Sequence, residues 1–459
     1  MPEHSVGYEP SERGGFFLHV NVVFASQIVL YGLAFLLRVL LARGLGDDDL
    51  GTYSLFFIAV LVAGGIANLG VGLGNIYFLN KGAHSYETLL AGSLFVTAAV
   101  TVATSLLVVG YGAVFGAELF VFGWTYWLYT AALPGVVAYL LLTSFLQASS
   151  RFPALGAVGV AQGGSAVLIS GVLYAMGELD VGGAVTAWTA SFLLADAVAF
   201  AFVGRGRTDF RRIVRPDWAA LRDQVRYGIQ GQIANLATLF NYRLDQFLVA
   251  AFVTRAAVGH YTVAVGLAEA VWWVSSAVAI VMLPRLTEME SERAGVLTPV
   301  VCRNTLAVSA VAAIAIGVVS PLAIRILFGR EFDPAFWPLV LLMPGVVAAS
   351  ATRVLGSYLF SQGRVIYNTY ATFLALGVTL ALDLALIPWL EVEGAAIASS
   401  VAYTCALAAT LYWFRAVSGR GIAEALVIRR KDFAEYAAGW RRLRSRLRVS
   451  GRIDINSPK

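Results

Sequence analysis

The chain has 459 residues, of which 59% are hydrophobic and only 13% are charged. A soluble protein usually carries about 25% charged residues, so this composition excludes a set of soluble domains with wetted surfaces. Apolar runs of about 20 residues or more recur along the chain, and each is long enough to cross a bilayer. Both cysteines, Cys302 and Cys405, lie inside apolar runs, which argues against a disulfide scaffold. The chain is therefore predicted to be an all-α polytopic membrane protein.

The hydropathy pattern predicts twelve transmembrane helices. In chain order they cover residues 17–41, 52–79, 88–112, 124–147, 154–176, 182–203, 226–252, 259–283, 298–327, 336–359, 365–388 and 394–415. We expect a cytoplasmic N-terminal segment (1–16), two sets of six helices (17–203 and 226–415), a basic linker between them (204–225) and a basic tail (416–459). The connections are short, which leaves no room for a sizeable catalytic domain outside the membrane.

The distribution of lysine and arginine predicts the orientation of these helices. With the N-terminus in the cytoplasm, 25 of the 33 basic residues fall on the cytoplasmic side, three on the outer side and five inside the spans. An even number of spans places both termini on the same side. We therefore expect a multi-pass protein of the cell (plasma or inner) membrane with both termini in the cytoplasm.

Three short sequence matches indicate a tandem duplication. The matched segments are 50–54 and 258–262, 144–151 and 357–364, and 182–185 and 394–397. Their offsets are 208, 213 and 212 residues, which makes the repeat six spans long. An even period gives both halves the same orientation, and two such bundles with a substrate site between them are typical of a transporter. We expect two parallel six-helix bundles around a central cavity, and transport by alternating access.

Several of these segments also resemble a known family. The runs LARGLG at 41–46 and LGTY at 50–53 resemble the signature after the first helix of bacterial polysaccharide-biosynthesis flippases, members of the multidrug/oligosaccharidyl-lipid/polysaccharide exporter superfamily. RLDQFLV at 243–249, LPRL at 283–286 and GAA at 394–396 are similar to further segments of that family. The resemblance implies a flippase, not an enzyme. Its substrate would be a polyprenyl-pyrophosphate-linked oligosaccharide, moved from the inner to the outer leaflet for surface polysaccharide biosynthesis.

Charged residues deep in the membrane are the first candidates for a functional site, because each costs about 2.5–3.5 kcal/mol on insertion scales. At 1.5 Å per helical residue, Arg243 lies about 16 Å deep, Asp245 about 13 Å and Glu269 about 15 Å. Arg353 and Asp196 lie in the inner halves of their spans. Long side chains snorkel near span ends, which is where we place Arg38, Arg303, Arg325 and Asp383.

The seventh predicted span has two opposed faces. At 100° per residue, the apolar face carries Ile233, Ala237, Phe240, Leu244, Phe247, Leu248 and Ala251. The polar face carries Gln232, Asn235, Thr238, Tyr242, Arg243, Asp245 and Gln246. We expect the polar face to line a cavity. The alternative is that it packs against another helix, which neutralises its two charges.

The implied pyrophosphate head group needs cationic partners, and the planar fork of arginine suits phosphate oxygens. We predict that the substrate is bound by Arg243, Arg353, Arg38, Gln27, Asn235 and Tyr242. Three acidic residues are predicted to balance these arginines or to accept a coupling cation, namely Asp245, Glu269 and Asp196. For each of the three, the alternative is a structural ion pair, and for Arg38 it is snorkelling to the membrane surface.

Other functions are less consistent with the sequence. No catalytic residues, cofactor or metal ligands are predicted, and no Gly-x-x-x-x-Gly-Lys-Ser/Thr loop is present to support ATP coupling. Residues 80–87 lack the Gly-x-x-x-Asp-Arg/Lys-x-Gly-Arg/Lys motif usual after the second span of facilitator-type transporters. A polysaccharide polymerase would be expected to have a large outer loop. The alternative function that we keep is a cation-coupled exporter of small molecules or drugs from the same superfamily.

Twelve of the 33 basic residues lie between Arg415, at the end of the last predicted span, and Lys459 in the tail. Its segment from Trp440 to Arg448 is predicted to bind membrane lipids of the anionic inner leaflet as an interfacial helix, or simply to set the topology. Docking of a polysaccharide-assembly protein is the alternative. No nucleic-acid partner is expected for a tail tethered to the membrane.

Overall fold

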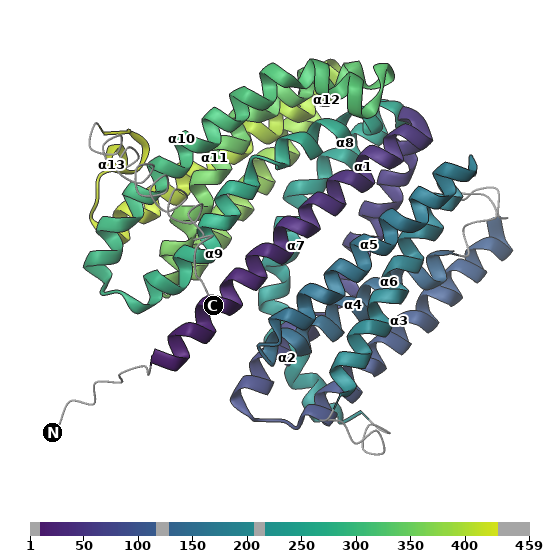
Figure 1. The fold of residues 1–459 in the computed structure, drawn as a ribbon, viewed down its shortest axis with the longest axis horizontal. Coiled ribbons are helices and arrows are strands. Elements are labelled where there is room, and N and C mark those ends of the chain that lie inside the picture. Colours follow the sequence, from purple (N-terminus) through teal and green to yellow (C-terminus); the bar gives the residue numbers. More distant parts are fainter. Residues whose placement is uncertain (1–9, 116–127, 206–215, 430–459) are drawn as a thin grey trace, which may run out of the picture. The chain divides into compact units, whose positions relative to one another are not determined.

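The computed structural model describes residues 10–115, 128–205 and 216–429. The predicted interfacial segment of the tail and residues 206–215 of the basic linker therefore lie outside the described residues. In the described ranges every regular element is a helix (Figure 1). The prediction of an all-helical chain is confirmed for that part of the protein.

The first half of the chain contains α1 (Pro10–Ala67), α2 (Val71–Lys81), α3 (Tyr86–Phe115), α4 (Tyr129–Ala148), α5 (Phe152–Met176) and α6 (Val181–Gly204). Helix α1 continues through a kink at Gly46, where φ is 78° and ψ is −177°. Only glycine adopts this conformation without strain. The second predicted span is interrupted, because Leu69 and Gly70 have positive φ between α1 and α2.

The second half contains α7 (Trp218–Phe252), α8 (Arg255–Glu269), α9 (Trp272–Glu288), α10 (Ser291–Ala323), a π-helical turn η4 (Ile324–Phe328), a 3-10 turn η5 (Arg330–Ala335), α11 (Phe336–Ser361), α12 (Val365–Ser418) and α13 (Ile422–Leu426). Helices α8 and α9 are bent by 43° at the break between them. The predicted span 259–283 is therefore not one straight helix. Helix α12 continues through a kink at Glu391.

The structure confirms a polytopic membrane protein but does not confirm twelve spans. In the described residues, eight helices are long and apolar enough to cross a membrane, or nine if the bent pair α8–α9 forms one span. Two physical reasons account for the difference. Helix α12 runs through a kink and covers two predicted spans, and α1 runs through a kink and covers the first predicted span and part of the second. Helix α7 is not among the apolar helices because charged and amide side chains interrupt it.

The chain divides into two compact units. Unit 1 comprises Met1–Glu269, Ile316–Met343 and Thr372–Ala402, and unit 2 comprises Ala270–Ala315, Pro344–Ala371 and Tyr403–Lys459. One boundary falls at the break between α8 and α9, and another at a proline inside α11. The division into two six-helix halves stays a prediction.

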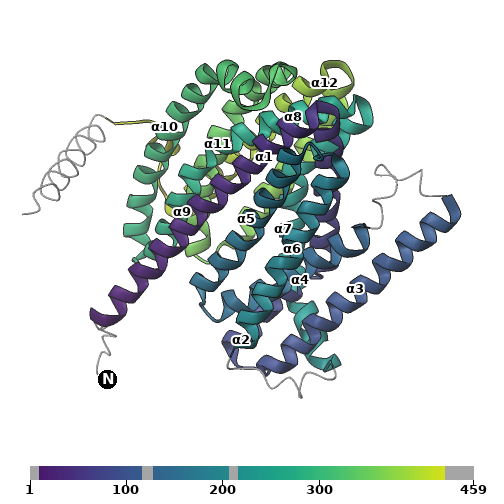
Figure 2. The same cartoon turned by 45° about the vertical axis from the view of Figure 1, so that its right-hand side comes forward.

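Close packing in unit 1 depends on glycine. Helix α1 lies along α5 and α8, and α2 lies against α4 and α7 (Figures 1 and 2). A Cβ atom at Gly70 would overlap the backbone of Gly228, and one at Gly74 would overlap that of Gln224. The glycines of the second predicted span therefore permit close helix contact.

A buried amide network lies beside these glycines. The side-chain amide of Asn75 donates to Ser93 Oγ at 3.0 Å and to Ser144 Oγ at 2.9 Å, and Gln224 Nε2 donates to Asn75 Oδ1. All four side chains are buried. The network joins α2, α3, α4 and α7 through groups that would be costly to leave unpaired.

Helices α1 and α8 cross through two glycines that are equivalent in the sequence repeat. A Cβ atom at Gly51 would overlap the carbonyl oxygen of Arg255, and a Cβ atom at Gly259 would overlap that of Asp47. Both contacts join residues of the two copies, and Gly259 follows Gly51 by the same 208 positions by which Arg255 follows Asp47. The contact is therefore reciprocal, as at a two-fold axis, which supports the tandem duplication. His260 Nε2 lies 3.0 Å from Asp47 Oδ2 at the same crossing.

Unit 2 has its own apolar core, to which α9, α10, α11, α12 and α13 contribute. Its buried members include Leu286, Cys302, Val354 and Phe414. Arg303 on α10 is only 6% exposed, so this arginine does not snorkel as expected. Its Nη1 donates to the carbonyl oxygen of Glu424 at 3.2 Å, which ties α13 to the core.

Candidate functional site

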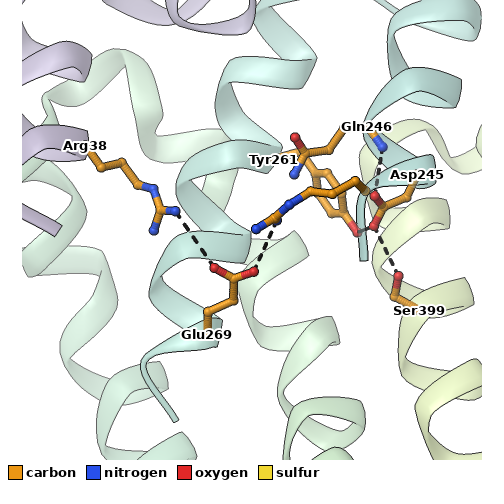
Figure 3. A network of polar contacts seen from close by, with 7 residues as sticks. Arg38, Asp245, Gln246, Tyr261, Glu269 and Ser399 are labelled. Carbon is orange, nitrogen blue, oxygen red and sulfur yellow. Dashed lines mark hydrogen bonds and ion pairs between the residues drawn. The ribbon is translucent and has the colours of Figure 1, made fainter. Parts of the chain in front are cut away.

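An arginine–carboxylate cluster lies where α1, α7 and α8 meet in unit 1 (Figure 3). Arg243 Nη1 lies 3.1 Å from Glu269 Oε1, and Arg38 Nη2 lies 3.9 Å from Glu269 Oε2. One carboxylate thus bridges two guanidinium groups, using a different oxygen for each. The side chains of Arg38, Arg243 and Glu269 are 26%, 20% and 22% exposed, so the cluster is not sealed inside the protein.

Gly266 makes room for Arg38 in this cluster. It lies about one turn before Glu269 on α8, and a Cβ atom at this position would overlap the guanidinium group of Arg38. The guanidinium group can therefore lie against the backbone of α8. Figure 3 shows Arg38 pointing toward Glu269, so this side chain is part of the cluster and does not snorkel to a membrane surface.

A second carboxylate, that of Asp245, lies close by and is almost fully buried. Asp245 Oδ2 accepts hydrogen bonds from Tyr261 Oη at 2.6 Å and from Ser399 Oγ at 3.2 Å (Figure 3). Its Oδ1 accepts one from the backbone nitrogen of Gln246 at 2.8 Å. Asp245 also interacts electrostatically with Arg243, two residues earlier on α7. Three donors hold this carboxylate in one place.

Asp383 on α12 lies near Asp245. Thr379 Oγ1 donates to Asn241 Oδ1 at 3.0 Å, and each of these two residues lies one helical turn before an aspartate. The two aspartates interact electrostatically. Asp383 is fully buried, and among the described residues neither of its carboxylate oxygens has a hydrogen-bond partner. Burial of a charged carboxylate without partners is costly, so this pair is suited to holding a proton or a small cation.

Arg353 belongs to unit 2, where it is held by an aromatic ring and a hydroxyl group. Its Nη1 donates to Ser276 Oγ at 2.7 Å, and its Cζ lies 4.4 Å from the centre of the Trp272 ring. This is a cation–π contact. The indole nitrogen of Trp272 donates to the carbonyl oxygen of Val346 at 3.2 Å, which fixes the ring.

The polar face of α7 has two parts. Gln232, Asp245 and Gln246 are buried, as is Asn241 at the edge of the face, and Gln232 Nε2 donates to the carbonyl oxygen of Gly65. This part of the polar face therefore packs against other helices and does not line a cavity. Thr238, Tyr242 and Arg243 are half-buried and Asn235 is exposed, so these four residues form the open part.

Two predicted residues lie elsewhere. Gln27 is half-buried on α1. Asp196 is half-buried on α6, and its Oδ2 would lie 3.8 Å from a Cβ atom at Gly135 of α4. Asp196 is not part of the described arginine–carboxylate cluster. The substrate roles of Gln27, Asn235 and Tyr242, and the charge-balancing or ion-coupling role of Asp196, stay predictions.

The family comparison decides the identity of the chain. The sequence model described as "Polysaccharide biosynthesis protein" matches residues 19–290, which is more than half of the chain. The chain belongs to the polysaccharide biosynthesis protein family. The family that the sequence motifs predicted is thus confirmed. No curated protein matches this family member.

Solved structures of similar fold are membrane transporters. A multidrug resistance MATE family transporter of the MOP superfamily, in an inward-facing conformation, is 15% identical with a TM-score of 0.69 over 85% of this chain and 94% of that chain. The lipid II flippase MurJ in an inward closed conformation is 11% identical with a TM-score of 0.68 over 88% and 90%. A mutant of the Vibrio cholerae MATE transporter VcmN is 15% identical with a TM-score of 0.61 over 88% and 97%. The chain therefore shares the fold of these membrane transporters.

Sequence reasoning did not select Tyr261, Ser399 or Asp383 as site residues. Tyr261 lies in the repeated segment 258–262, and Asp383 follows Thr379 by one turn, as Asp245 follows Asn241. The shared spacing of polar residues on two helices was the available signal. Ser399 lies among alanines and another serine, and only its tertiary contact reveals its role.

Proposed function

We propose that this family member is a flippase. It moves a polyprenyl-pyrophosphate-linked oligosaccharide from the inner to the outer leaflet for surface polysaccharide biosynthesis, by alternating access. The observation that carries the proposal is the pair of half-buried arginines, Arg38 and Arg243, brought together by α1, α7 and α8. Membership of the polysaccharide biosynthesis protein family supports a sugar-linked substrate.

The two arginines suit a pyrophosphate head group. A head group that leaves water needs fixed positive charge and hydrogen-bond donors in place of its hydration shell. Each guanidinium group presents a planar fork of N–H donors to phosphate oxygens. Arg353 stacks on Trp272 in unit 2, and its role in substrate binding stays a prediction. The prenyl tail remains in lipid throughout.

The buried aspartates are proposed to bind the coupling cation. Glu269 pairs with both arginines, Asp245 interacts with Arg243, and Asp383 interacts in turn with Asp245, so that three carboxyl groups are linked to two guanidinium groups. With all five groups ionised, the negative charge exceeds the positive charge, and an anionic head group is disfavoured. Uptake of a proton or a sodium ion by the aspartate pair removes the excess negative charge. Cation binding thereby favours substrate binding, which couples the two.

Translocation of a labelled polyprenyl-pyrophosphate oligosaccharide in proteoliposomes tests this function. Arg243→Ala is expected to slow translocation by about tenfold or more, because a hydrogen bond to a charged group contributes about 1.5–3 kcal/mol. Arg293→Ala is the matched control, since Arg293 lies in an exposed pair with Glu290. It should retain the wild-type rate.

Two results would contradict the proposal. Translocation by Arg243→Ala at the wild-type rate would remove Arg243 from the binding site. A wild-type protein that exchanges drugs for cations, and leaves the lipid-linked oligosaccharide in place, would instead support the alternative cation-coupled exporter.

A further inference from the structure

Glu269 bridges two arginines, and the need to balance the charge of Arg243 does not by itself explain this position. Asp245 already interacts electrostatically with Arg243 from the same helix. Glu269 additionally bridges Arg243 and Arg38, with one carboxylate oxygen toward each guanidinium group (Figure 3). Two oxygens of one phosphate group present a similar pattern of negative charge to a pair of arginines. Glu269 therefore contacts the same arginine forks that the proposed head group needs.

The bridge is strong on one side only. The 3.1 Å separation from Arg243 is within hydrogen-bond range, whereas the 3.9 Å separation from Arg38 is beyond it. All three side chains are partly exposed, and exposed ion pairs contribute little to stability. A phosphate group carries more negative charge and more acceptor oxygens than a carboxylate. A pyrophosphate is thus able to replace Glu269 on both arginines.

Glu269 is also placed where a small backbone change moves it. It is the last residue of α8, and α9 begins at Trp272 after the 43° bend. The boundary between the two compact units falls directly after Glu269. Hinges are a few residues at element ends that absorb changes of φ and ψ. A change in the backbone and side-chain torsion angles of Glu269 itself can move its carboxylate away from the arginines and leave the rest of α8 folded.

We propose that Glu269 is an internal competitor of the substrate. Its carboxylate and the pyrophosphate head group exchange on Arg38 and Arg243: the head group displaces Glu269 on binding, and Glu269 returns to expel the head group on release. This inference rests on the proposed function, because it requires an anionic head group at these arginines. The competitor lowers the affinity for the substrate so that a site built from two arginines can still release a highly charged group.

Binding of farnesyl diphosphate to the purified full-length protein in detergent, measured by calorimetry, tests the competitor role. Glu269→Gln is expected to bind this probe about tenfold more tightly than the wild type, because the competing charge is removed. Glu269→Asp should fall between them, since its shorter side chain cannot bridge both arginines. Arg243→Ala should lose binding. Glu178→Gln, at an exposed position between α5 and α6, is the matched control and should bind like the wild type.

Transport kinetics provide a second test, because a purely structural role of Glu269 would not give the following change in the two kinetic parameters. In proteoliposomes, Glu269→Gln should show a lower half-saturating substrate concentration together with a lower maximal translocation rate, because release becomes slow. If Glu269→Gln does not fold, Glu269→Asp carries the same two measurements.

The outcomes separate this inference from the function on which it rests. If the wild type binds the probe, Arg243→Ala does not, and Glu269→Gln binds equally or more weakly, the competitor role is wrong and the proposed function stands. If neither the wild type nor Glu269→Gln binds farnesyl diphosphate, and neither translocates the lipid-linked oligosaccharide, both proposals fail together.

Discussion

Asp245 and Asp383 lie close together on neighbouring helices, yet their surroundings differ. Asp245 accepts hydrogen bonds from Tyr261, Ser399 and a backbone N–H group. The carboxylate of Asp383 has no hydrogen-bond partner among the described residues. The donors around Asp245 favour its charged form. Asp383 is therefore the member of the pair whose charge most needs a bound proton or cation.

Replacement of Asp383 by asparagine should uncouple transport. Asparagine has the size of aspartate but carries no charge to be balanced. We expect Asp383→Asn to translocate substrate at one rate with or without a proton or sodium gradient, whereas the wild type is accelerated by one of the two gradients. Asp48→Asn, at an exposed position on α1, should keep the wild-type response. A gradient response retained in Asp383→Asn would exclude this residue from coupling.

Depth along the sequence identifies some of these residues and not others. Arg243 and Glu269 lie far from any span end, so a count of residues finds them. Asp383 lies five residues before the end of the predicted span 365–388, which suggested a position near the membrane surface. In the structure α12 continues to the kink at Glu391, and Asp383 is buried. Arg38 joins the cluster because Gly266 on a distant segment makes room for it. Such a contact depends on tertiary packing, which hydropathy does not describe.

The crossing of α1 and α8 is a close contact between the two sequence repeats in unit 1, and substitutions can test it directly. Gly51 and Gly259 each lie against a backbone carbonyl of the other repeat. Neither position has room for a side chain, and neighbouring backbone cannot yield as a flexible side chain can. Both glycines are therefore required for the same geometric reason.

Gly51→Val and Gly259→Val are expected to destabilise the protein by similar amounts, about 1–3 kcal/mol each. Thermal unfolding of the purified protein in detergent measures the change as a lower transition temperature. Gly32→Val on α1 is the control, because a Cβ atom there meets nothing within 4 Å. A large loss for one glycine and none for the other would contradict the reciprocal contact.

Helix ends are predicted well where the sequence marks them. The predicted spans 154–176 and 182–203 correspond to α5 (Phe152–Met176) and α6 (Val181–Gly204). Gly177 ends α5 in the left-handed conformation, and the Asp180 side chain accepts a hydrogen bond from the backbone of Gly183 to begin α6. The break at residues 270–271 carries no such signal, because an alanine and a valine continue the apolar run. A hydropathy pattern therefore reads α8 and α9 as one span.

At the scale of the whole molecule, the compact units do not follow the sequence repeat. Unit 1 contains the first half of the chain and three segments of the second half, and α10, α11 and α12 each contribute residues to both units. Hydropathy predicts which segments enter the membrane. It does not predict which of them pack together, because apolar side chains fit lipid and protein equally well.

The orientation of the whole chain can be tested with single cysteines. Cys302 and Cys405 are first replaced by alanine. A membrane-impermeant maleimide should then label Glu178→Cys in intact cells, because the loop after α5 is predicted to face outward. Glu288→Cys, at the end of α9, should be labelled only after permeabilisation. Both residues are exposed. The reverse pattern would place the termini outside the cell.

The kinks in α1 and α12 also bear on which changes of sequence the site tolerates. Each kink joins two predicted spans through a single non-helical residue, Gly46 or Glu391. Arg38 precedes the first kink, and Asp383 and Ser399 lie on opposite sides of the second. One inserted residue would turn the following helix by about 100°, and Ser399 would then point away from Asp245. An insertion or deletion at Glu391 is therefore expected to break the hydrogen bond between Ser399 and Asp245, whereas a substitution there keeps the spacing of the two helical segments.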